Sequence, residues 1–177
     1  MFRIVLKEHQ ELCQQMQAIQ ATADVYLSER KDYQLLKSIP GIGPIIALII
    51  LAEAGDLTRF THYRQFLKFC GFDLSTQQSG SFRGQTKLSK YGNARLRYAF
   101  WIAATVAIRQ RENTFRRKYE NYIKKDPTNA DLKRKSYTAA AAKMARVAYS
   151  VVKHQTNYQC HYETSIVPSG QIASIGP

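Results

Sequence analysis

The chain has 177 residues and carries 26 Lys and Arg against 13 Asp and Glu, which gives a net charge of +13 at pH 7. Hydrophobic residues make up 45% of the chain, enough to build a core, so a disordered basic tail is excluded. The longest apolar runs, 42–52 and 98–108, fall well short of the roughly 20 residues that a membrane-crossing helix needs. We therefore expect no membrane association and no secretion.

The three cysteines are scattered and include no C-x-x-C pair. They support neither a disulfide framework nor a zinc knuckle. A cytoplasmic location is the expectation that follows.

The positive charge is concentrated in the middle of the chain. Residues 83–125 hold 12 Lys and Arg against 2 Glu, whereas residues 1–82 hold 8 charges of each sign. This concentration favours a polyanion such as DNA or RNA as partner, because phosphates neutralised by Lys and Arg release condensed counterions. The alternative is a solvated basic face, or one that binds acidic lipid or protein.

Residues 2–31 contain neither Gly nor Pro and predict one long helix. Apolar positions recur in alternating steps of four and three residues, with one polar position, along a seam formed by Val5, His9, Leu12, Met16, Ile19, Ala23 and Tyr26. A seam this narrow is typical of a coiled coil. It should pack on another helix, either within this chain or in a partner.

Residues 33–54 predict a helix-hairpin-helix. A short helix should end before Pro40, Gly41 and Gly43 permit a tight turn, and Pro44 suits the first turn of the next helix. Such a turn can present backbone N–H groups to a phosphate, which makes Gly41 and Gly43 candidate nucleic-acid-binding residues. The alternative is a tight helix turn that only packs.

Further helices are predicted along the rest of the chain. Residues 56–71 and 115–125 read as short amphipathic or basic helices, and the Ala-rich residues 137–153 as a central one. Residues 93–112 form a clear helix with Asn93 as its N-cap.

Residues 72–92 are rich in Ser, Thr and Gly and predict a long functional loop, with a short strand pair as the alternative. Residues 154–177 show no periodicity and predict a flexible tail. The sequence therefore predicts an all-α fold: a helical domain with a helix-hairpin-helix, a long functional loop and an N-terminal coiled-coil-like helix.

Ser79 stands beside a glycine in the loop that leads into the cationic segment. A phosphodiester brought to this serine would meet guanidinium and backbone N–H groups that hold the charge developing on phosphorus, so Ser79 is a candidate nucleophile. A serine hydroxyl needs a base or a metal to lose its proton, and no Ser-His-Asp set is readable. On chemistry alone, a turn is the commoner role of a Ser-Gly pair.

Four separated blocks of the sequence resemble the C-terminal domain of one insertion-sequence transposase family. The blocks are residues 39–43, 69–71, 78–80 and 88–97, and their order and spacing are kept. The family comprises the serine transposases that pair an N-terminal RuvC-like domain with a C-terminal helix-hairpin-helix domain. It includes the Piv-type DNA invertases and the bridge-RNA-guided recombinases.

The resemblance implies that Ser79 attacks DNA and forms a covalent phosphoserine link, with Ser75 and Ser81 as the alternatives if the loop register differs. Basic residues that follow this serine would contact DNA, with guide RNA as a further candidate partner. The residues expected to make these contacts are Arg83, Lys87, Lys90, Arg95 and Arg97.

One departure from the family is large. The RuvC-like half supplies a carboxylate quartet for a divalent metal, expected to be Mg²⁺, and this chain has no room for it. The resemblance thus implies a C-terminal piece: a connector or coiled-coil arm at 1–32, a transposase helical domain at 33–153 and a tail at 154–177. We expect no metal or cofactor site in this chain, a homo-oligomer, and a serine-type recombinase that binds nucleic acid but is inactive alone.

Two other functions remain open. A non-catalytic helix-hairpin-helix module would grip DNA or RNA with strong salt dependence and without any need for Ser79. A protein-interaction module would dimerise through residues 2–31.

Overall fold

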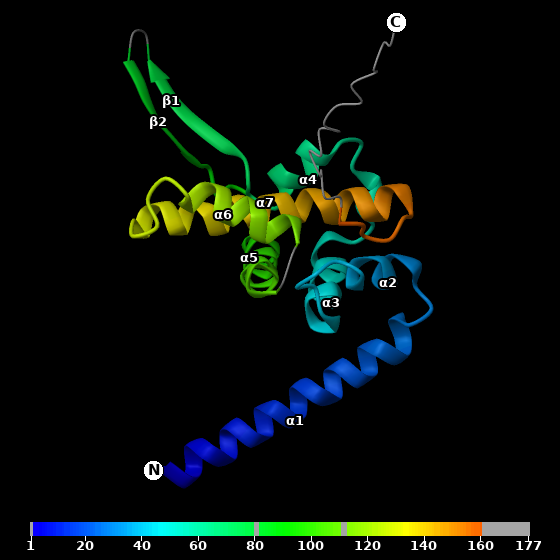
Figure 1. The fold of residues 1–177 in the computed structure, drawn as a ribbon. Helices are drawn as coiled ribbons and strands as arrows, with labels where there is room; N and C mark the ends of the chain where they lie inside the picture. The colour runs from blue at the N-terminus through cyan, green and yellow to red at the C-terminus, as the bar shows by residue number, and fades with distance from the viewer. Residues whose placement is uncertain (1, 80–81, 111–112, 161–177) are drawn as a thin grey trace, which may run out of the picture.

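The computed structural model describes residues 2–79, 82–110 and 113–160, and for residues 76–85 only the backbone is described. Within these residues the elements are, in order, α1 (Phe2–Leu27), α2 (Lys31–Lys37), α3 (Pro44–Ala54), the 3-10 helix η1 (Leu57–Arg59), α4 (Tyr63–Phe69), β1 (Leu74–Ser79), β2 (Phe82–Leu88), α5 (Ala94–Arg109), α6 (Thr114–Ile123) and α7 (Ala130–His154) (Figure 1). The sequence predicted an all-α fold, and the helical class is confirmed, since most of the described residues are helical. One two-stranded antiparallel sheet, β1–β2, is added to it.

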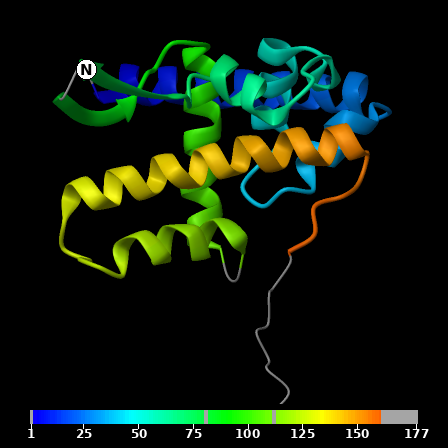
Figure 2. The ribbon, with the colours of Figure 1, turned by 90° about the horizontal axis from the view of Figure 1, so that it is seen from above.

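Helix α7 lies at the centre of the core. It packs against α4, α5 and α6, and Figure 2 shows α6 running alongside it. Phe66 of α4 and Phe100 of α5 are fully buried, with ring centroids 6.0 Å apart and planes nearly perpendicular at 86°. Tyr149 of α7 stacks on Phe66, and its hydroxyl donates to the Phe60 carbonyl at 2.8 Å, so the polar end of this buried ring is satisfied.

Helices α2 and α3 form the predicted helix-hairpin-helix. The chain leaves α2 at Ser38, Gly43 precedes α3 in an extended conformation, and Pro44 occupies the first turn of α3. Pro suits this position because its missing N–H would have no helical partner there. Ile39 and Ile42 of the turn are buried, so the hairpin is held by apolar packing as well as by its backbone.

Three helices begin at asparagine caps. The side chains of Asn93, Asn113 and Asn129 accept hydrogen bonds from backbone N–H groups in the first turns of α5, α6 and α7. The predicted cap at Asn93 is confirmed. Helix α7 begins at Ala130, seven residues before the predicted start at residue 137. It begins there because the Asn129 side chain caps its first backbone N–H groups.

The segment predicted as one short helix over 56–71 contains two. Asp56 caps η1, and His62 accepts a hydrogen bond from the backbone N–H of Arg64 at the start of α4. Phe60 and the residue after it are extended or bent between the two helices. The prediction of a single helix here is therefore wrong, because these two local caps divide the segment.

Helix α1 leaves the helical body, and most of its surface is exposed (Figure 1). The long helix is confirmed, but only Ala23 of the predicted seam is buried. The helix is anchored at its C-terminal end, where the Tyr33 hydroxyl donates to Asp24 at 2.6 Å and Lys37 Nζ lies 3.6 Å from the same carboxylate oxygen. Burial, and then the hydrogen bond to Asp24, raise the pKa of Tyr33 to about 12.

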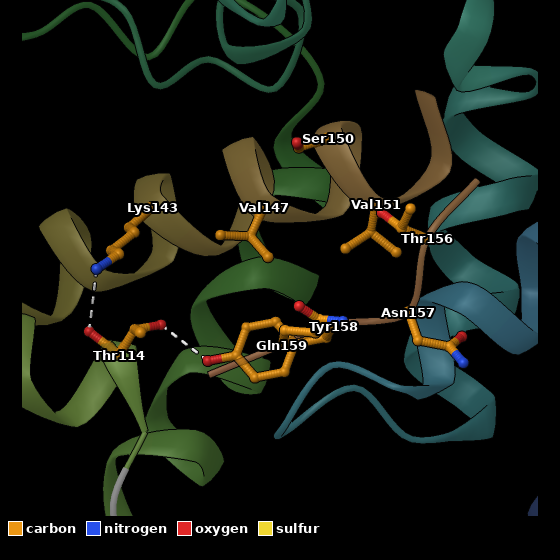
Figure 3. Close-up of a pocket in the computed structure, with 9 residues that line it drawn as sticks. All are labelled: Thr114, Lys143, Val147, Ser150, Val151, Thr156, Asn157, Tyr158 and Gln159. Atoms are coloured by element: carbon orange, nitrogen blue, oxygen red, sulfur yellow. Dashed lines mark hydrogen bonds between the residues drawn. The ribbon is translucent and has the colours of Figure 1, made fainter. Parts of the chain in front are cut away.

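The first part of the predicted tail, residues 155–160, lies against the helical body. The Tyr158 backbone N–H donates to the Ser38 hydroxyl at 2.9 Å, and the Tyr158 and Thr114 hydroxyls are 2.9 Å apart (Figure 3). The Tyr158 ring also stacks on Phe115, with centroids 5.9 Å apart. The prediction of a flexible tail over 154–177 does not describe this part, and residues 161–177 lie outside the described residues.

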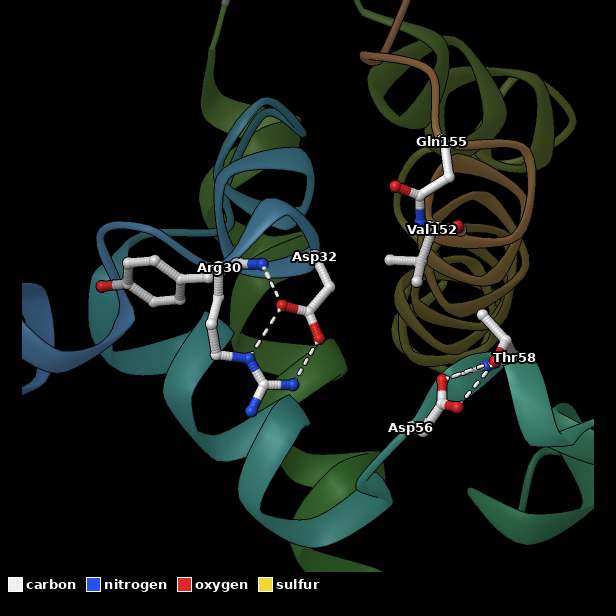
Figure 4. Close-up of polar contacts among 7 residues, drawn as sticks. Arg30, Asp32, Asp56, Thr58, Val152 and Gln155 are labelled. Atoms are coloured by element: carbon white, nitrogen blue, oxygen red, sulfur yellow. Dashed lines mark hydrogen bonds and ion pairs between the residues drawn. The ribbon is translucent and has the colours of Figure 1, made fainter.

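Short polar contacts fix the loops that flank α2 and α3 (Figure 4). Arg30 Nε and Nη2 donate to both carboxylate oxygens of Asp32, at 3.1 and 2.6 Å. Asp56 accepts from the backbone N–H and the hydroxyl of Thr58, at 2.8 and 2.7 Å. These hydrogen bonds from Thr58 lower the pKa of Asp56. Of these bonds, the one from the Thr58 backbone N–H to Asp56 caps the 3-10 helix η1.

None of the described helices combines the length and the apolar composition that crossing a membrane requires.

Candidate nucleic-acid interface

Strands β1 and β2 form a ribbon that extends away from the helical body (Figure 1). They pair antiparallel from Leu74 opposite Leu88 to Ser79 opposite Phe82, with a register shift between Thr76 and Gln78. The predicted loop of residues 72–92 is thus a strand pair, the alternative that the sequence allowed. We call it the ribbon.

The base of the ribbon is fixed between α4 and α5. The Ser89 backbone N–H donates to the Asp73 carbonyl at 2.8 Å, and the Asn93 N–H donates to the Phe69 carbonyl at 2.7 Å. Gly92, with φ of +136°, lies so close to α4 that a Cβ there would come within 2.6 Å of the Phe69 carbonyl oxygen. Only glycine fits this contact. The ribbon therefore extends from a base that these contacts hold rigidly against α4.

Arg97 holds the base of the ribbon together from α5. Its Nη1 donates to the Lys90 carbonyl at 3.1 Å, and its guanidinium lies against Gly71. The buried Cys70 is next to it, and burial raises the pKa of that thiol while the Arg97 charge lowers it by a smaller amount. The half-buried side chain of Arg97 therefore has a structural role at the ribbon base, and its contact with nucleic acid stays a prediction.

Arg95 lies on the exposed side of α5 and pairs with a carboxylate. Its Nη1 is 3.1 Å from Glu53 Oε1, and Asn93 Nδ2 donates to Glu53 Oε2 at 2.7 Å. The hydrogen bond from Asn93, and then that from Arg95, lower the pKa of Glu53. Arg95 is reachable by a phosphate, which would compete with Glu53 for its guanidinium.

The predicted nucleophile lies at the outer end of the ribbon. Ser79 is the last residue of β1, and Arg83 lies in β2 across the turn, whereas the side chains of both fall outside the described residues. Ser81, one alternative, lies outside them altogether. Ser75, the other, sits near the base, where its hydroxyl donates to the Lys87 carbonyl at 3.4 Å.

The side chains of Lys87 and Lys90 are exposed along and below β2. Lys90 has φ of +58°, a conformation that turns the chain from the ribbon towards α5. These two lysines therefore sit beside the same rigid base as Arg95. Three of the predicted contact residues, Lys87, Lys90 and Arg95, thus lie around the base of the ribbon, with Arg97 beneath them.

The helix-hairpin-helix does not lie beside the ribbon (Figure 1, Figure 2). Gly41, with φ of +88°, presses against α5, where a Cβ would collide with the Ala103 carbonyl oxygen and lie 3.0 Å from Ala107. Gly43 faces open space, with no heavy atom within 4 Å of its Cβ position. Gly41 is thus a packing residue of the turn, and Gly43 is the more accessible of the two.

An aromatic surface was missed in the sequence analysis. Tyr98 and Trp101 of α5 are exposed, with ring planes 10° apart and centroids 6.4 Å apart. Tyr137 of α7 follows at 6.2 Å from Trp101, and Tyr119 of α6 at 4.9 Å from Tyr137. The spacing of Tyr98 and Trp101, three residues apart on one helix, was the only available signal, and it lay inside an apolar run that predicted core.

A cavity of about 390 Å³ lies between α7, the start of α6 and residues 156–159 (Figure 3). Lys143 borders it and donates to the Thr114 carbonyl at 3.3 Å. Burial, and then the charges of Lys118 and Arg146, lower the pKa of Lys143. The neighbouring hydroxyls belong to Thr114 and Tyr158, so the cavity has a cationic and hydroxyl-rich wall.

The described residues contain no group of three or more His, Cys, Asp or Glu side chains that could hold a metal ion. They therefore do not fit the divalent metal that the family resemblance implies.

These features define a helix-hairpin-helix domain that carries a protruding basic ribbon. Residues 33–120 match the family described as Transposase IS116/IS110/IS902, and the chain belongs to this family of insertion-sequence transposases. The resemblance found in the sequence is confirmed.

Three relatives are similar to this chain. It is 29% identical over 130 residues to the transposase for insertion sequence element IS1111A of Coxiella burnetii, which covers 73% of the chain and 35% of the relative. It is 27% identical over 129 residues to a probable family 20 transposase of Pseudomonas aeruginosa, with 71% and 37% covered. It is 27% identical over 161 residues to the transposase for IS1328 of Yersinia enterocolitica, with 87% and 46% covered. The chain thus spans less than half the length of each.

Proposed function

We propose that this chain is the DNA-binding part of a transposase and that it carries the serine nucleophile for strand cleavage and joining. The observation that carries the proposal is the ribbon: a two-stranded element with a rigid base, with Ser79 at its outer end and exposed Lys87 and Lys90 along it. The major groove of B-DNA admits a two-stranded β-ribbon. A ribbon inserted there would carry Ser79 to the sugar–phosphate backbone.

The charge distribution supports a nucleic-acid partner. The segment from Arg83 through α6 holds most of the excess positive charge. Within its described residues, Arg95 pairs with Glu53 and Arg116 pairs with Glu120. Lysines without a carboxylate partner gain most from phosphate neutralisation. DNA is the proposed ligand, and guide RNA is proposed as a second one on the same basic surface.

In the proposed step the Ser79 oxygen forms a bond to phosphorus and the bond between phosphorus and one strand oxygen breaks. The serine proton passes to a general base, and the leaving oxygen takes up a proton. A phosphoserine link then joins protein and DNA until a strand hydroxyl attacks it in the reverse sense. We propose that a RuvC-like half, which the resemblance places outside this chain, completes the site.

The exposed seam of α1 supports a further part of the proposal, a homo-oligomer. Val5, Leu12, Met16 and Ile19 are all more than half exposed along one side of the helix. Burying such a row against a second helix would be favourable at about 25 cal/mol per Å² of apolar surface.

Binding is tested first, on the chain alone. A labelled DNA duplex is titrated with the chain at a series of salt concentrations, and we expect affinity to fall steeply as salt rises. Lys87→Ala should reduce the salt slope by about one. Lys7→Ala, with the same change of charge on α1, is the matched control. Binding that does not depend on salt contradicts the proposal.

Chemistry is tested with a RuvC-like half added. Ser79→Ala should leave DNA binding unchanged and abolish the protein–DNA adduct that survives denaturation. Ser75→Ala is the control, because its hydroxyl lies at the ribbon base. An adduct that persists in Ser79→Ala removes this serine from the mechanism. If neither the unmodified chain nor the Ser75→Ala variant forms an adduct, and binding still depends on salt, the non-catalytic binding module is favoured.

A further inference from the structure

A groove of about 330 Å³ opens beside the base of the ribbon, where α5 and α7 meet it. The residues that line it are Phe72, Leu88, Lys90, Ala94, Arg97, Tyr98, Trp101 and Thr138. Its volume is at the lower end of the range in which proteins hold small ligands. It adjoins the surface that the proposed function assigns to DNA.

Two of the lining side chains are large aromatics that the fold leaves in solvent. Tyr98 is 63% exposed and Trp101 is 41% exposed. Their ring planes are only 10° apart, so both present flat faces in a common orientation. Side chains of this size normally contribute most of their area to a core or an interface. Parallel aromatic faces suit a planar ligand that stacks on them.

Charge narrows the choice of ligand. The groove contains Lys90 and Arg97 and no acidic residue among those that line it. An apolar peptide would use the rings but would offer no anion to the exposed Lys90 ammonium. A nucleotide uses both, because its base stacks on the rings while its phosphate meets the exposed lysine.

We propose that Tyr98 and Trp101 form a stacking site for one unpaired nucleobase of the DNA strand bound along the ribbon, with its phosphate held by Lys90. The site rests on the proposed function. It selects against intact duplex, because paired bases expose only their edges and keep their faces stacked on one another. A strand exchanged during recombination supplies such unpaired bases.

Trp101 is the only tryptophan of the chain, so its fluorescence reports on this groove alone. The full chain is titrated with a single-stranded oligonucleotide and, at the same salt concentration, with a duplex of equal phosphate number. We expect single-stranded DNA to quench the fluorescence and duplex DNA to bind without quenching. Tyr98→Ala should weaken single-strand binding by about 5-fold to 100-fold and change duplex binding by less than about 2-fold.

Tyr91→Ala is the matched control. Tyr91 is 84% exposed, lies close by in the sequence and does not line the groove. Both variants remove exposed rings, and thermal unfolding checks that each is folded. The proposal is overturned if Tyr98→Ala and Tyr91→Ala weaken single-strand binding equally.

The remaining outcomes separate this proposal from the one on which it rests. Salt-dependent duplex binding without any single-strand quenching overturns the stacking site and leaves the DNA-binding function standing. No binding of either oligonucleotide overturns both. Fluorescence that changes with protein concentration in the absence of DNA assigns the groove to a second copy of the chain and overturns the stacking site.

Discussion

Replacing Gly41 with alanine tests whether the hairpin turn is pressed against α5. At φ of +88° a side chain costs about 1–2 kcal/mol relative to glycine. The new Cβ would also meet the Ala103 carbonyl oxygen and the Ala107 backbone nitrogen, and neither atom can move without bending the helix. Overpacking of this kind costs about 1–3 kcal/mol. We expect Gly41→Ala to lower the free energy of unfolding by about 2–5 kcal/mol.

Gly43→Ala provides the matched comparison two residues away. Gly43 has φ of −89° and no neighbour within 4 Å of the Cβ position, so the change should cost less than about 1 kcal/mol. Urea unfolding followed by circular dichroism measures both variants, and for a chain of this size each 1 kcal/mol shifts the melting temperature by about 2–4 °C. Equal stability of the two variants would refute the close packing of Gly41 on α5.

Three further predictions follow from the polar contacts. Glu53→Gln should tighten DNA binding by about 2- to 5-fold in a salt-dependent way, because it frees the Arg95 guanidinium for phosphate. The glutamine carbonyl would still accept the hydrogen bond from Asn93. Fluorescence anisotropy titrations would measure the change in affinity. Arg97→Ala should lower the free energy of unfolding by about 1–2 kcal/mol, measured with urea, because the half-buried guanidinium holds the ribbon base. Tyr33→Phe should cost about 1 kcal/mol at neutral pH by removing the hydrogen bond to Asp24, measured by unfolding over a range of pH.

The pH dependence at Tyr33 has a definite sign. Its pKa is raised in the folded state to about 12, so the hydroxyl stabilises the fold fully below pH 10 and loses that contribution as the pH rises towards 12. Tyr33→Phe should therefore reduce the alkaline loss of stability, whereas Tyr26→Phe, on an exposed ring, should not. An unchanged alkaline limb in Tyr33→Phe would contradict the buried hydrogen bond.

The predictions for Glu53→Gln and Arg97→Ala each have a control variant with the same change of charge. Glu29→Gln removes an exposed carboxylate far along the chain from the ribbon and should leave DNA affinity nearly unchanged. Arg109→Ala removes an exposed arginine at the other end of α5 and should cost less than about 0.5 kcal/mol. If these controls match Glu53→Gln and Arg97→Ala, the contacts assigned to those two residues are wrong.

Local signals in the sequence were sufficient for most of the helices and for some of their ends, but not for the division of residues 56–71 or for the start of α7. The proline and glycine positions around Pro44 predict the hairpin, and Asn93 predicts the start of α5, because caps and turns depend on a few neighbouring residues. The family resemblance likewise depends on short separated blocks of sequence.

Contacts between distant segments were not predictable in the same way. The sequence indicates a surface cation at Arg97, but its guanidinium packs against Gly71 and donates a hydrogen bond to the Lys90 carbonyl. Tyr98 reads as the start of an apolar run, although its ring is exposed. Tyr158 follows the last periodic helix, yet it reaches Ser38 across 120 positions of sequence. Periodicity reports one face of one element and carries no information on which element covers it.

The long N-terminal helix has a mechanical consequence. A helix of 26 residues is about 39 Å long at a rise of about 1.5 Å per residue, and its hold on the body is confined to the last two turns, around Asp24. The helix from Asp24 to its free tip is about 33 Å long, so a tilt of about 10° at that hinge would displace the tip by about 6 Å. Any group at the amino end of α1 would therefore move much farther than the residues around Asp24, where the helix is held.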